Sequence, residues 1–213
     1  MNYVANTIGW ATYTINPIKG LCQGGCWYCY ARRMYQRFKW NKEIRLDLSV
    51  LDNIDKIKEP SRIFLCSTHE LFGEWIPDKW IFDIITKCQK YSQHIFLLLT
   101  KNPKRYLDFT FRDNFWLGET ITDDKRTPIM KREKGITFIS YEPLMSDVIP
   151  IFRYTNWVII GALTGRGLNC DYKYPRETWI RHILEAADKF NVPVFMKNNL
   201  KPYWEGEFRQ EFP

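Results

Sequence analysis

Three cysteines near the N-terminus constrain this chain more than any other feature. Cys22, Cys26 and Cys29 are separated by three residues and then by two, and Gly24 and Gly25 lie in the first gap. Thiolate sulfur is the usual protein ligand of iron–sulfur clusters, and glycine lets a backbone curl tightly around an inorganic core. Three thiolates can hold three irons of a cubane cluster, which leaves the fourth iron for a small molecule. The spacing therefore predicts a 4Fe-4S cluster with one open iron.

A structural zinc site and unligated thiols are the alternatives. Closed zinc sites need four ligands, which usually arrive as two Cys-x2-Cys or Cys/His pairs, and the sequence has no second pair. The other cysteines, Cys66, Cys88 and Cys170, are far apart. Cys66 follows an apolar run and Cys88 lies in a helical pattern, so both are expected to be small core residues. A clustered triplet favours metal binding in a reducing compartment over disulfides.

Length and composition predict one domain. The chain has 213 residues, of which 45% are hydrophobic, and it has no low-complexity stretch. We expect a single domain over residues 1–213, with a cluster loop at 20–30 and a C-terminal tail at 200–213. The longest apolar run, Ile95 to Leu99, is too short to cross a bilayer, and Met1 to Trp10 lacks the basic start and apolar block of a signal peptide. A cytoplasmic protein is therefore expected.

Apolar runs alternate with helical patterns, which predicts an α/β fold with a mostly parallel sheet. Tyr30 to Phe38 and Trp179 to Phe190 have helical spacing, and Pro77 precedes a third helix whose apolar stripe ends at Cys88. Seven strands in a chain shorter than an eight-unit barrel suggest a partial barrel. The expected strands cover residues 12–16, 62–66, 95–99, 115–117, 136–139, 157–160 and 194–196.

Polar residues follow several of these strands. In βα architectures the chemistry collects at the C-terminal ends of the strands, so these residues are candidates for function. Each also has an ordinary explanation as a turn former or a helix cap. The residues are Ser67, Thr68, His69 and Glu70 after the second strand, Thr100, Lys101 and Asn102 after the third, Glu119 and Thr120 after the fourth, Tyr141 and Glu142 after the fifth, and Lys197, Asn198 and Asn199 after the last.

The cysteine loop resembles that of the radical S-adenosylmethionine superfamily, whose members carry a Cys-x3-Cys-x-aromatic-Cys signature near the N-terminus. Tyr28 fills the aromatic position. This resemblance implies a 4Fe-4S cluster whose open iron binds the amino and carboxylate groups of S-adenosylmethionine. An injected electron then cleaves the cofactor to a 5'-deoxyadenosyl radical. The resemblance also implies a partial barrel of the (β/α)6 type.

Six segments carry a second resemblance. They are Asn16-Pro17, Cys29-Tyr30-Ala31, Leu99-Thr100-Lys101, Trp116-Leu117-Gly118, Ser140-Tyr141-Glu142-Pro143-Leu144 and Trp157-Val158-Ile159-Ile160-Gly161. These segments are similar to the phage Gp37/Gp68 family, a radical-SAM-like group also described as a domain of unknown function. The similarity runs over nearly the whole chain, and it brings no established substrate.

The superfamily resemblance implies roles for residues that follow the strands. Ser67-Thr68-His69-Glu70 stands where superfamily members usually carry a Gly-Gly-Glu-like motif that holds the amino group of the cofactor, and the sequence departs from that motif. His69 is either a satisfied buried histidine or an acid/base group for the substrate. The candidate cofactor-binding residues are Tyr28, Ser67, Glu70, Lys101, Glu119 and Gly161, and the candidate catalytic residues are His69, Glu70 and Glu142.

Gly161 begins a small-residue turn that resembles the backbone approaching the adenine of the cofactor, and glycine permits such an approach. Glu119 and Glu142, at adjacent strand ends, have two interpretations. They bind ribose hydroxyls or a cationic substrate group, or they form structural ion pairs with Lys101 or Arg166.

The net charge of +7, the pI near 9.0, nine tryptophans and twelve tyrosines suit an anionic partner. Lys125 to Lys134, with five basic residues in ten positions, is the densest patch, although charge runs are commonly solvated faces. Nucleic acid or a nucleotide is one possible substrate class, and a peptide or a small metabolite is the other. A low-potential flavodoxin or ferredoxin is the expected electron donor, which a basic surface would attract.

The predicted function is that of a radical S-adenosylmethionine enzyme that abstracts hydrogen from an unidentified substrate. Two other classes stay open. An iron–sulfur nucleic-acid-binding or repair-associated protein would keep the cluster without radical catalysis, and its binding would depend strongly on salt. A zinc module without catalysis is the third class.

Overall fold

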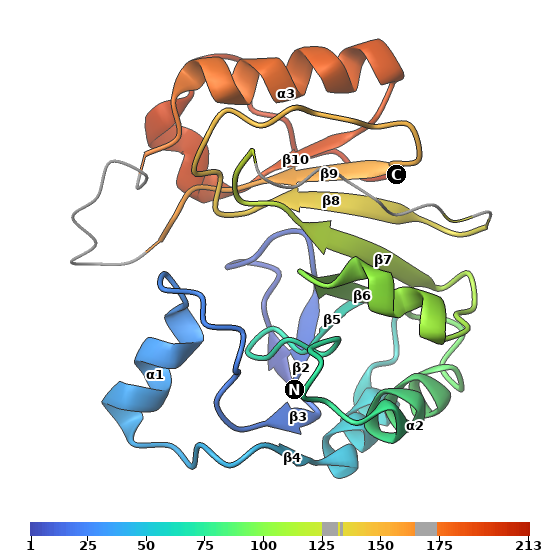
Figure 1. The fold of residues 1–213 in the computed structure, drawn as a ribbon. Coiled ribbons are helices and arrows are strands. Elements are labelled where there is room, and N and C mark those ends of the chain that lie inside the picture. The colour runs from blue at the N-terminus through green and yellow to red at the C-terminus, as the bar shows by residue number, and fades with distance from the viewer. Residues whose placement is uncertain (125–131, 133, 165–173) are drawn as a thin grey trace. The chain divides into compact units, whose positions relative to one another are not determined.

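The chain forms a mixed α/β fold whose strands are mostly parallel, which confirms the predicted fold class (Figure 1). The computed structural model describes residues 1–124, 132, 134–164 and 174–213. Contacts divide the chain into two units, residues 1–116 and 117–213, and each is described by itself. No helix in the described part of the chain is both long and apolar enough to span a membrane.

Unit 1 contains a sheet with the strand order β1-β2-β5-β6. β2, β5 and β6 run parallel, and β1 pairs with β2 in the antiparallel sense. In a separate two-stranded ribbon, β3, which directly precedes the cysteine loop, pairs with β4, which lies further along the chain. The bounds are β1 Asn2–Tyr3, β2 Tyr13–Ile15, β3 Ile18–Lys19, β4 Arg45–Leu46, β5 Arg62–Leu65 and β6 Ile95–Thr100.

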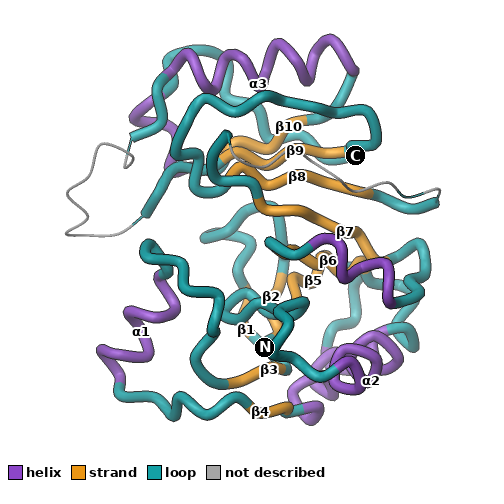
Figure 2. Tube along the Cα trace, viewed as in Figure 1, coloured by secondary structure: helices purple, strands orange, loops and turns teal. Residues whose placement is uncertain are grey.

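The helices of unit 1 connect these strands (Figure 2). They are α1 Tyr30–Phe38, α2 Asp78–Cys88 and the 3-10 helices η1 Leu48–Lys56 and η2 Pro103–Asp108. α2 begins after Pro77 and buries an apolar stripe at helical spacing, as predicted: Ile81, Ile84, Ile85 and Cys88. α1 has the predicted bounds, but it buries only Ala31 and Tyr35. Its other residues are exposed or half-buried.

Unit 2 contains four parallel strands in the order β7-β8-β9-β10, and β7 begins just before the boundary between the units. α3 packs its apolar stripe against these strands, and the core includes Ile180, Ile183, Val158 and Met196. The bounds are β7 Phe115–Thr120, β8 Thr137–Tyr141, β9 Trp157–Ile160, α3 Glu177–Phe190, β10 Val194–Met196 and the 3-10 helix η4 Asn198–Tyr203.

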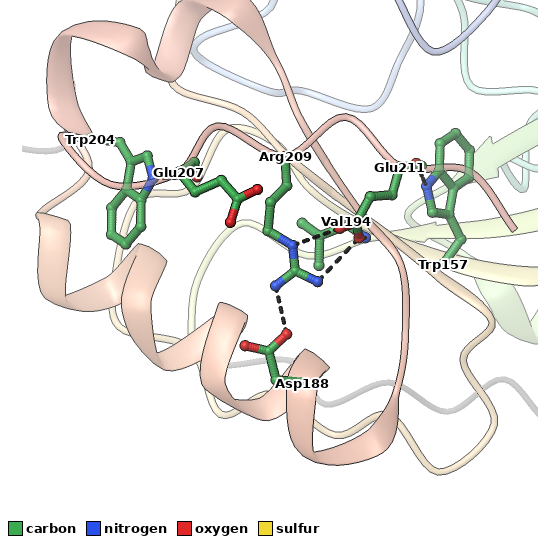
Figure 3. Close-up of polar contacts among 7 residues, drawn as sticks. All are labelled: Trp157, Asp188, Val194, Trp204, Glu207, Arg209 and Glu211. Carbon is green, nitrogen blue, oxygen red and sulfur yellow. Dashed lines mark hydrogen bonds and ion pairs between the residues drawn. The ribbon is translucent and has the colours of Figure 1, made fainter.

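The C-terminal segment ties β10 to α3 (Figure 3). Arg209 donates hydrogen bonds to Asp188 near the end of α3 and to Glu211. The Glu211 carboxylate accepts the backbone N–H of Val194 at 2.8 Å, and its carbonyl accepts the indole N–H of Trp157. The segment therefore covers the free edge of the unit 2 strands through paired charges and backbone bonds.

Several predicted strands are longer or shorter in the structure. β7 extends to Thr120, β8 to Tyr141 and β6 to Thr100, so Glu119, Tyr141 and Thr100 lie inside strands rather than after them. The predicted strand at 12–16 shortens to β2. β1, β3, β4 and the 3-10 helices were not predicted. The two-residue strands are too short for a period of two to be read from sequence.

Candidate functional site

The three cysteines lie half-buried on the loop between β3 and α1. The base of this loop is held by backbone bonds. The N–H of Leu21 donates to the carbonyl of Lys42 at 2.9 Å, and the N–H of Cys29 donates to the carbonyl of Cys26 at 3.2 Å. The loop thus closes on itself at its C-terminal end and is tied to the chain after α1 at its start.

Glycine is required at the start of this loop. Gly20 has a φ of +98°, and a Cβ there would overlap the backbone carbonyl of Glu43. Gly25 has a φ of +69°, and an added Cβ would make only an ordinary contact, 3.9 Å from the carbonyl oxygen of Gln23. Gly24 lies against the Cys22 sulfur, to which an added Cβ would come within 3.4 Å. Gly20 and Gly25 therefore curve the loop through their positive φ, and Gly24 leaves room for the Cys22 sulfur.

The Cys22 sulfur has the most developed surroundings of the three. It accepts the N–H of Gly24 at 3.4 Å. Burial raises the pKa of this thiol, the backbone N–H groups of Gly24 and Glu70 oppose that rise, and the negative charges of Glu70 and Cys29 add to it. Cys22 is therefore a thiol without a metal, and it lies within electrostatic range of Cys29. Metal binding would replace its proton.

An iron–sulfur cluster needs soft sulfur donors held close together. Three soft sulfurs on one glycine-containing loop, with backbone N–H groups directed at Cys22, match the chemistry of iron–sulfur ligation, in which hydrogen bonds to sulfur tune the cluster. In the described residues, no three His, Cys, Asp or Glu side chains are arranged to hold a metal ion. The fit therefore rests on the kind and spacing of the donors.

His69 is buried behind the cysteine loop, and both of its ring nitrogens have partners. Nδ1 lies 3.3 Å from the carbonyl of Gly20, and the indole of Trp75 donates to Nε2 at 3.1 Å. This arrangement requires a neutral ring with its proton on Nδ1. Burial lowers the pKa of His69, against a smaller opposite effect of the Gly20 carbonyl. Of the two interpretations of His69, the geometry favours the satisfied buried histidine.

The Glu70 carboxylate joins the ends of β5 and β6. It accepts hydrogen bonds from the Thr100 hydroxyl at 2.7 Å, the backbone N–H of Lys101 at 2.9 Å and the backbone N–H of Phe72 at 3.2 Å. Burial raises the pKa of the Cys22 thiol, and the backbone N–H of Glu70 is one of the groups that oppose this rise. Glu70 therefore connects the cysteine loop with two strand ends, which the sequence predicted only as neighbouring polar positions.

Ser67 and Tyr28 complete the predicted positions in unit 1. The Ser67 hydroxyl donates to the side-chain oxygen of Asn16 at 3.2 Å, and its carbonyl accepts the hydroxyl of Tyr30 at 2.8 Å. Tyr28 packs edge-on against Trp27. Asn16 and Trp75 are the residues that sequence reasoning missed. Asn16 lies in one of the segments shared with the Gp37/Gp68 family, which was the available signal.

The predicted site residues of unit 2 form a second polar group. Glu119 is buried within β7. Burial raises the pKa of the Tyr141 hydroxyl, and the negative charge of Glu119 adds to that rise. Glu142, after β8, forms an ion pair with Lys197, after β10. The ion pair at Glu142 was predicted with Lys101 or Arg166, but its partner in the structure is Lys197, and Arg166 lies outside the described residues.

Side chains of unit 2 itself lie against Gly161. A Cβ at this position would lie 3.0 Å from Lys197 Cδ and 3.2 Å from Glu142 Cγ. The ion pair thus rests on the end of β9, and the glycine makes room for it. Nearby, the Asn199 side chain exchanges two hydrogen bonds with the backbone of Ala162.

The remaining cysteines of the described chain are core residues, as predicted. Cys66 and Cys88 are buried, and burial raises the pKa of Cys66 to about 12 and that of Cys88 as well. Cys170 and most of the basic patch from Lys125 to Lys134 lie outside the described residues.

Comparison with known proteins places the chain in a family. A family model described as "Protein of unknown function (DUF5131)" matches residues 5–208. The chain belongs to this family. The match spans both units and agrees with the resemblance to the Gp37/Gp68 group. No curated protein and no solved structure matches the chain. Membership in the DUF5131 family carries no activity with it, so function has to be argued from the site.

Proposed function

We propose that this DUF5131 protein is a radical S-adenosylmethionine enzyme. The observation that carries the proposal is the Cys22, Cys26, Cys29 loop, with two backbone N–H groups at the Cys22 sulfur and the Glu70 carboxylate beside it. These cysteines would hold a 4Fe-4S cluster. When bound, the cluster with S-adenosylmethionine supplies reductive cleavage to a 5'-deoxyadenosyl radical, which takes hydrogen from a substrate.

The residues around the loop have positioning roles in this proposal. Tyr35 and His69 bind the two backbone polar groups of Gly20, and the indole N–H of Trp75 donates to the other ring nitrogen of His69. A loop fixed in this way presents its sulfurs with little loss of conformational entropy on metal binding. The N–H groups of Gly24 and Glu70 favour the thiolate form of Cys22, which is the form that binds metal.

Glu70 is the main candidate for holding the amino group of the cofactor. Its carboxylate is fixed by three donors, and a carboxylate has about four lone-pair positions, so one stays for an ammonium group. Ser67 lies at the same strand end. His69 acts as a positioning residue, and Glu70 and Glu142 stay as catalytic candidates. Lys101 contributes a backbone N–H to Glu70.

The finer fold assignment belongs to the same proposal. A partial (β/α)6 barrel of the radical S-adenosylmethionine kind is supported by parallel strands in each unit and by helices α1, α2 and α3 between consecutive strands. Residues 142–156, between β8 and β9, form loops and turns without a helix, so the alternation of strand and helix is incomplete.

We further propose a cytoplasmic location and a flavodoxin or ferredoxin as electron donor. An oxygen-sensitive cluster requires a reducing compartment. The donor proteins are acidic, and the net charge of +7 suits an acidic partner.

Metal analysis after anaerobic purification and reconstitution tests the cluster. We expect about four irons and four sulfides per chain. Cys22→Ala, Cys26→Ala and Cys29→Ala should each lose the visible absorbance, and Cys88→Ala, at a buried thiol far along the chain, is the matched control that keeps it. Stoichiometric zinc in place of iron would establish the zinc module instead.

A second experiment separates the enzyme from an iron–sulfur binding protein. Protein reduced with dithionite is incubated with S-adenosylmethionine, and 5'-deoxyadenosine is quantified. Cleavage by the native chain and none by Cys26→Ala supports the enzyme. A protein that contains the cluster but does not bind S-adenosylmethionine in a calorimetric titration would favour the nucleic-acid-binding alternative. The exposed basic and aromatic residues around α1 are consistent with that alternative.

A further inference from the structure

A basic and aromatic surface covers the C-terminal end of α1 and the residues after it. We call Arg37, Phe38, Lys39, Trp40 and Lys42 the α1 surface. All five are exposed. Phe38 is 51% exposed and Trp40 is 42% exposed, although both are large apolar residues that usually lie inside. The α1 surface therefore presents aromatic rings to solvent.

The rings of the α1 surface are ordered into a stack. The guanidinium of Arg37 lies 5.3 Å above the centre of the Phe38 ring. The Phe38 and Trp40 rings are stacked, with centroids 5.4 Å apart and an interplanar angle of 21°. Trp40 in turn meets the buried Tyr35 edge to face, at 5.3 Å. The stack is thus anchored to the interior through Tyr35. Because the rings are already ordered, binding a ligand costs them little conformational entropy.

The charge of this region is one-sided. Residues 27–45 contain six basic side chains and one acidic side chain, Glu43. Within the described part of the chain, Arg37, Lys39 and Lys42 form no ion pair with an acidic group. Cations without an acidic partner, next to exposed rings, fit a ligand that combines anionic groups with flat apolar faces.

From this combination we propose that the α1 surface binds single-stranded nucleic acid. Unpaired bases pack against the solvent-exposed parts of the Phe38 and Trp40 rings, and Arg37, Lys39 and Lys42 contact the phosphates. Every base has a π-face, so such a platform accepts many sequences. A duplex hides these faces within its own stack, and an acidic protein needs the charges but not a ring stack. Single strands therefore use both properties of the surface.

This inference adds a substrate class to the proposed function. Only the idea that the bound strand is the substrate rests on the enzyme proposal. α1 begins at Tyr30, directly after Cys29, and the Tyr30 hydroxyl donates to the carbonyl of Ser67 at the end of β5. At the other end of the helix, the carbonyl of Lys42 accepts the backbone N–H of Leu21, the residue before Cys22, so a strand bound at the α1 surface lies near the start of the cysteine loop. Binding itself requires neither the cluster nor S-adenosylmethionine.

Fluorescence anisotropy of the full chain with labelled oligothymidylate of about twenty nucleotides tests the proposal. We expect binding that weakens with salt, and weaker binding to a duplex of equal length. Phe38→Ala and Trp40→Ala should each reduce affinity roughly tenfold. The double variant Lys39→Glu, Lys42→Glu should have a weaker salt dependence. The negative slope of log affinity against log salt should become smaller in magnitude by about 1.4, since each phosphate contact with a single strand contributes about 0.7.

Matched controls lie on α2, which Figure 1 shows on the other side of unit 1 from α1. Phe82 is a 61% exposed aromatic residue of α2, and Lys90 is an exposed cation just after it. Phe82→Ala and Lys90→Glu should bind the strand as the native chain does. Circular dichroism of every variant confirms that it is folded.

The outcomes separate this inference from the proposed function. Cys26→Ala should lose iron and still bind the strand with native affinity. A native chain that takes up no cluster would overturn the enzyme proposal and leave the inference standing. Equal binding of duplex and single strand, unaffected by Phe38→Ala and Trp40→Ala, would overturn the inference. Binding of a reduced ferredoxin instead of the strand, lost in Lys39→Glu, would also overturn it and assign the surface to an acidic protein.

Discussion

The Tyr35 hydroxyl accepts a hydrogen bond from the backbone N–H of Gly20, with 2.9 Å between the nitrogen and the oxygen. This bond is buried and joins the middle of α1 to the residue at which the cysteine loop begins. The carbonyl of the same glycine faces His69. The backbone of Gly20 is therefore held on both sides by side chains from other elements, and the loop conformation depends on them.

Tyr35→Phe should lower the free energy of unfolding by about 1 to 2 kcal/mol, because it leaves the buried N–H of Gly20 without its acceptor. Denaturation in urea measures the change. Tyr3→Phe, at a 60% exposed tyrosine, is the control and should change stability by less than about 0.5 kcal/mol. Equal effects of the two substitutions would show that the buried bond adds nothing.

Gly20→Ala should be much more damaging than Gly25→Ala. Both glycines have a positive φ, so each alanine incurs roughly 1 to 2 kcal/mol of backbone strain. Only at Gly20 does the new Cβ also overlap a backbone carbonyl, that of Glu43. The two variants are compared by thermal unfolding. Similar melting temperatures for both would contradict the described conformation of the loop.

Glu70→Gln should lower the free energy of unfolding by about 1 to 3 kcal/mol, since the amide turns one acceptor oxygen into a donor that faces other donors. Chemical denaturation provides the measurement. Glu74→Gln, at an exposed glutamate four residues on, serves as the control. A Glu70 variant as stable as this control would mean that the three bonds are not formed in solution.

Stability should fall as the pH is lowered below neutrality. Burial lowers the pKa of His69 and of His94 in the folded state, so the unfolded chain binds more protons than the folded chain below its ordinary histidine pKa of about 6.5. The contribution of these histidines to the free energy of unfolding is fully present above that pH, and it is lost as the pH falls toward their pKa in the folded state. Unfolding free energies measured between about pH 7.5 and 5 should show a smaller slope in His69→Gln. A steeper slope in this variant would show that folding raises the pKa of His69 instead of lowering it.

Arg209→Met should destabilise unit 2 by about 1 to 3 kcal/mol, because it removes bonds to both Asp188 and Glu211 and leaves the half-buried Glu211 with fewer donors (Figure 3). Hydrogen exchange at the Val194 amide reports the local effect. Lys79→Ala, which breaks a surface ion pair with Asp83, should cost about 0.5 kcal/mol or less. Unchanged exchange at Val194 would show that the C-terminal segment is held by other contacts.

Local pattern explains which parts of the fold were predicted. α1 and α2 were predicted from helical spacing and the proline before α2, and β5 and β9 from short apolar runs. Strand ends were less accurate, because Glu119 and Tyr141 are polar or amphipathic residues buried inside strands. Their burial depends on partners from other strands, and periodicity within one segment carries no information about these.

The amino-acid sequence alone determined that Cys22, Cys26 and Cys29 lie near one another, since no more than three residues separate each from the next along the chain. Only the tertiary structure decided which partners His69, Glu70 and Glu142 have, because Trp75, Thr100 and Lys197 reach them through turns or through strand order. It also decided that Phe38 and Trp40 face solvent. Apolar residues are expected inside, and exposure is set by what the rest of the chain leaves uncovered.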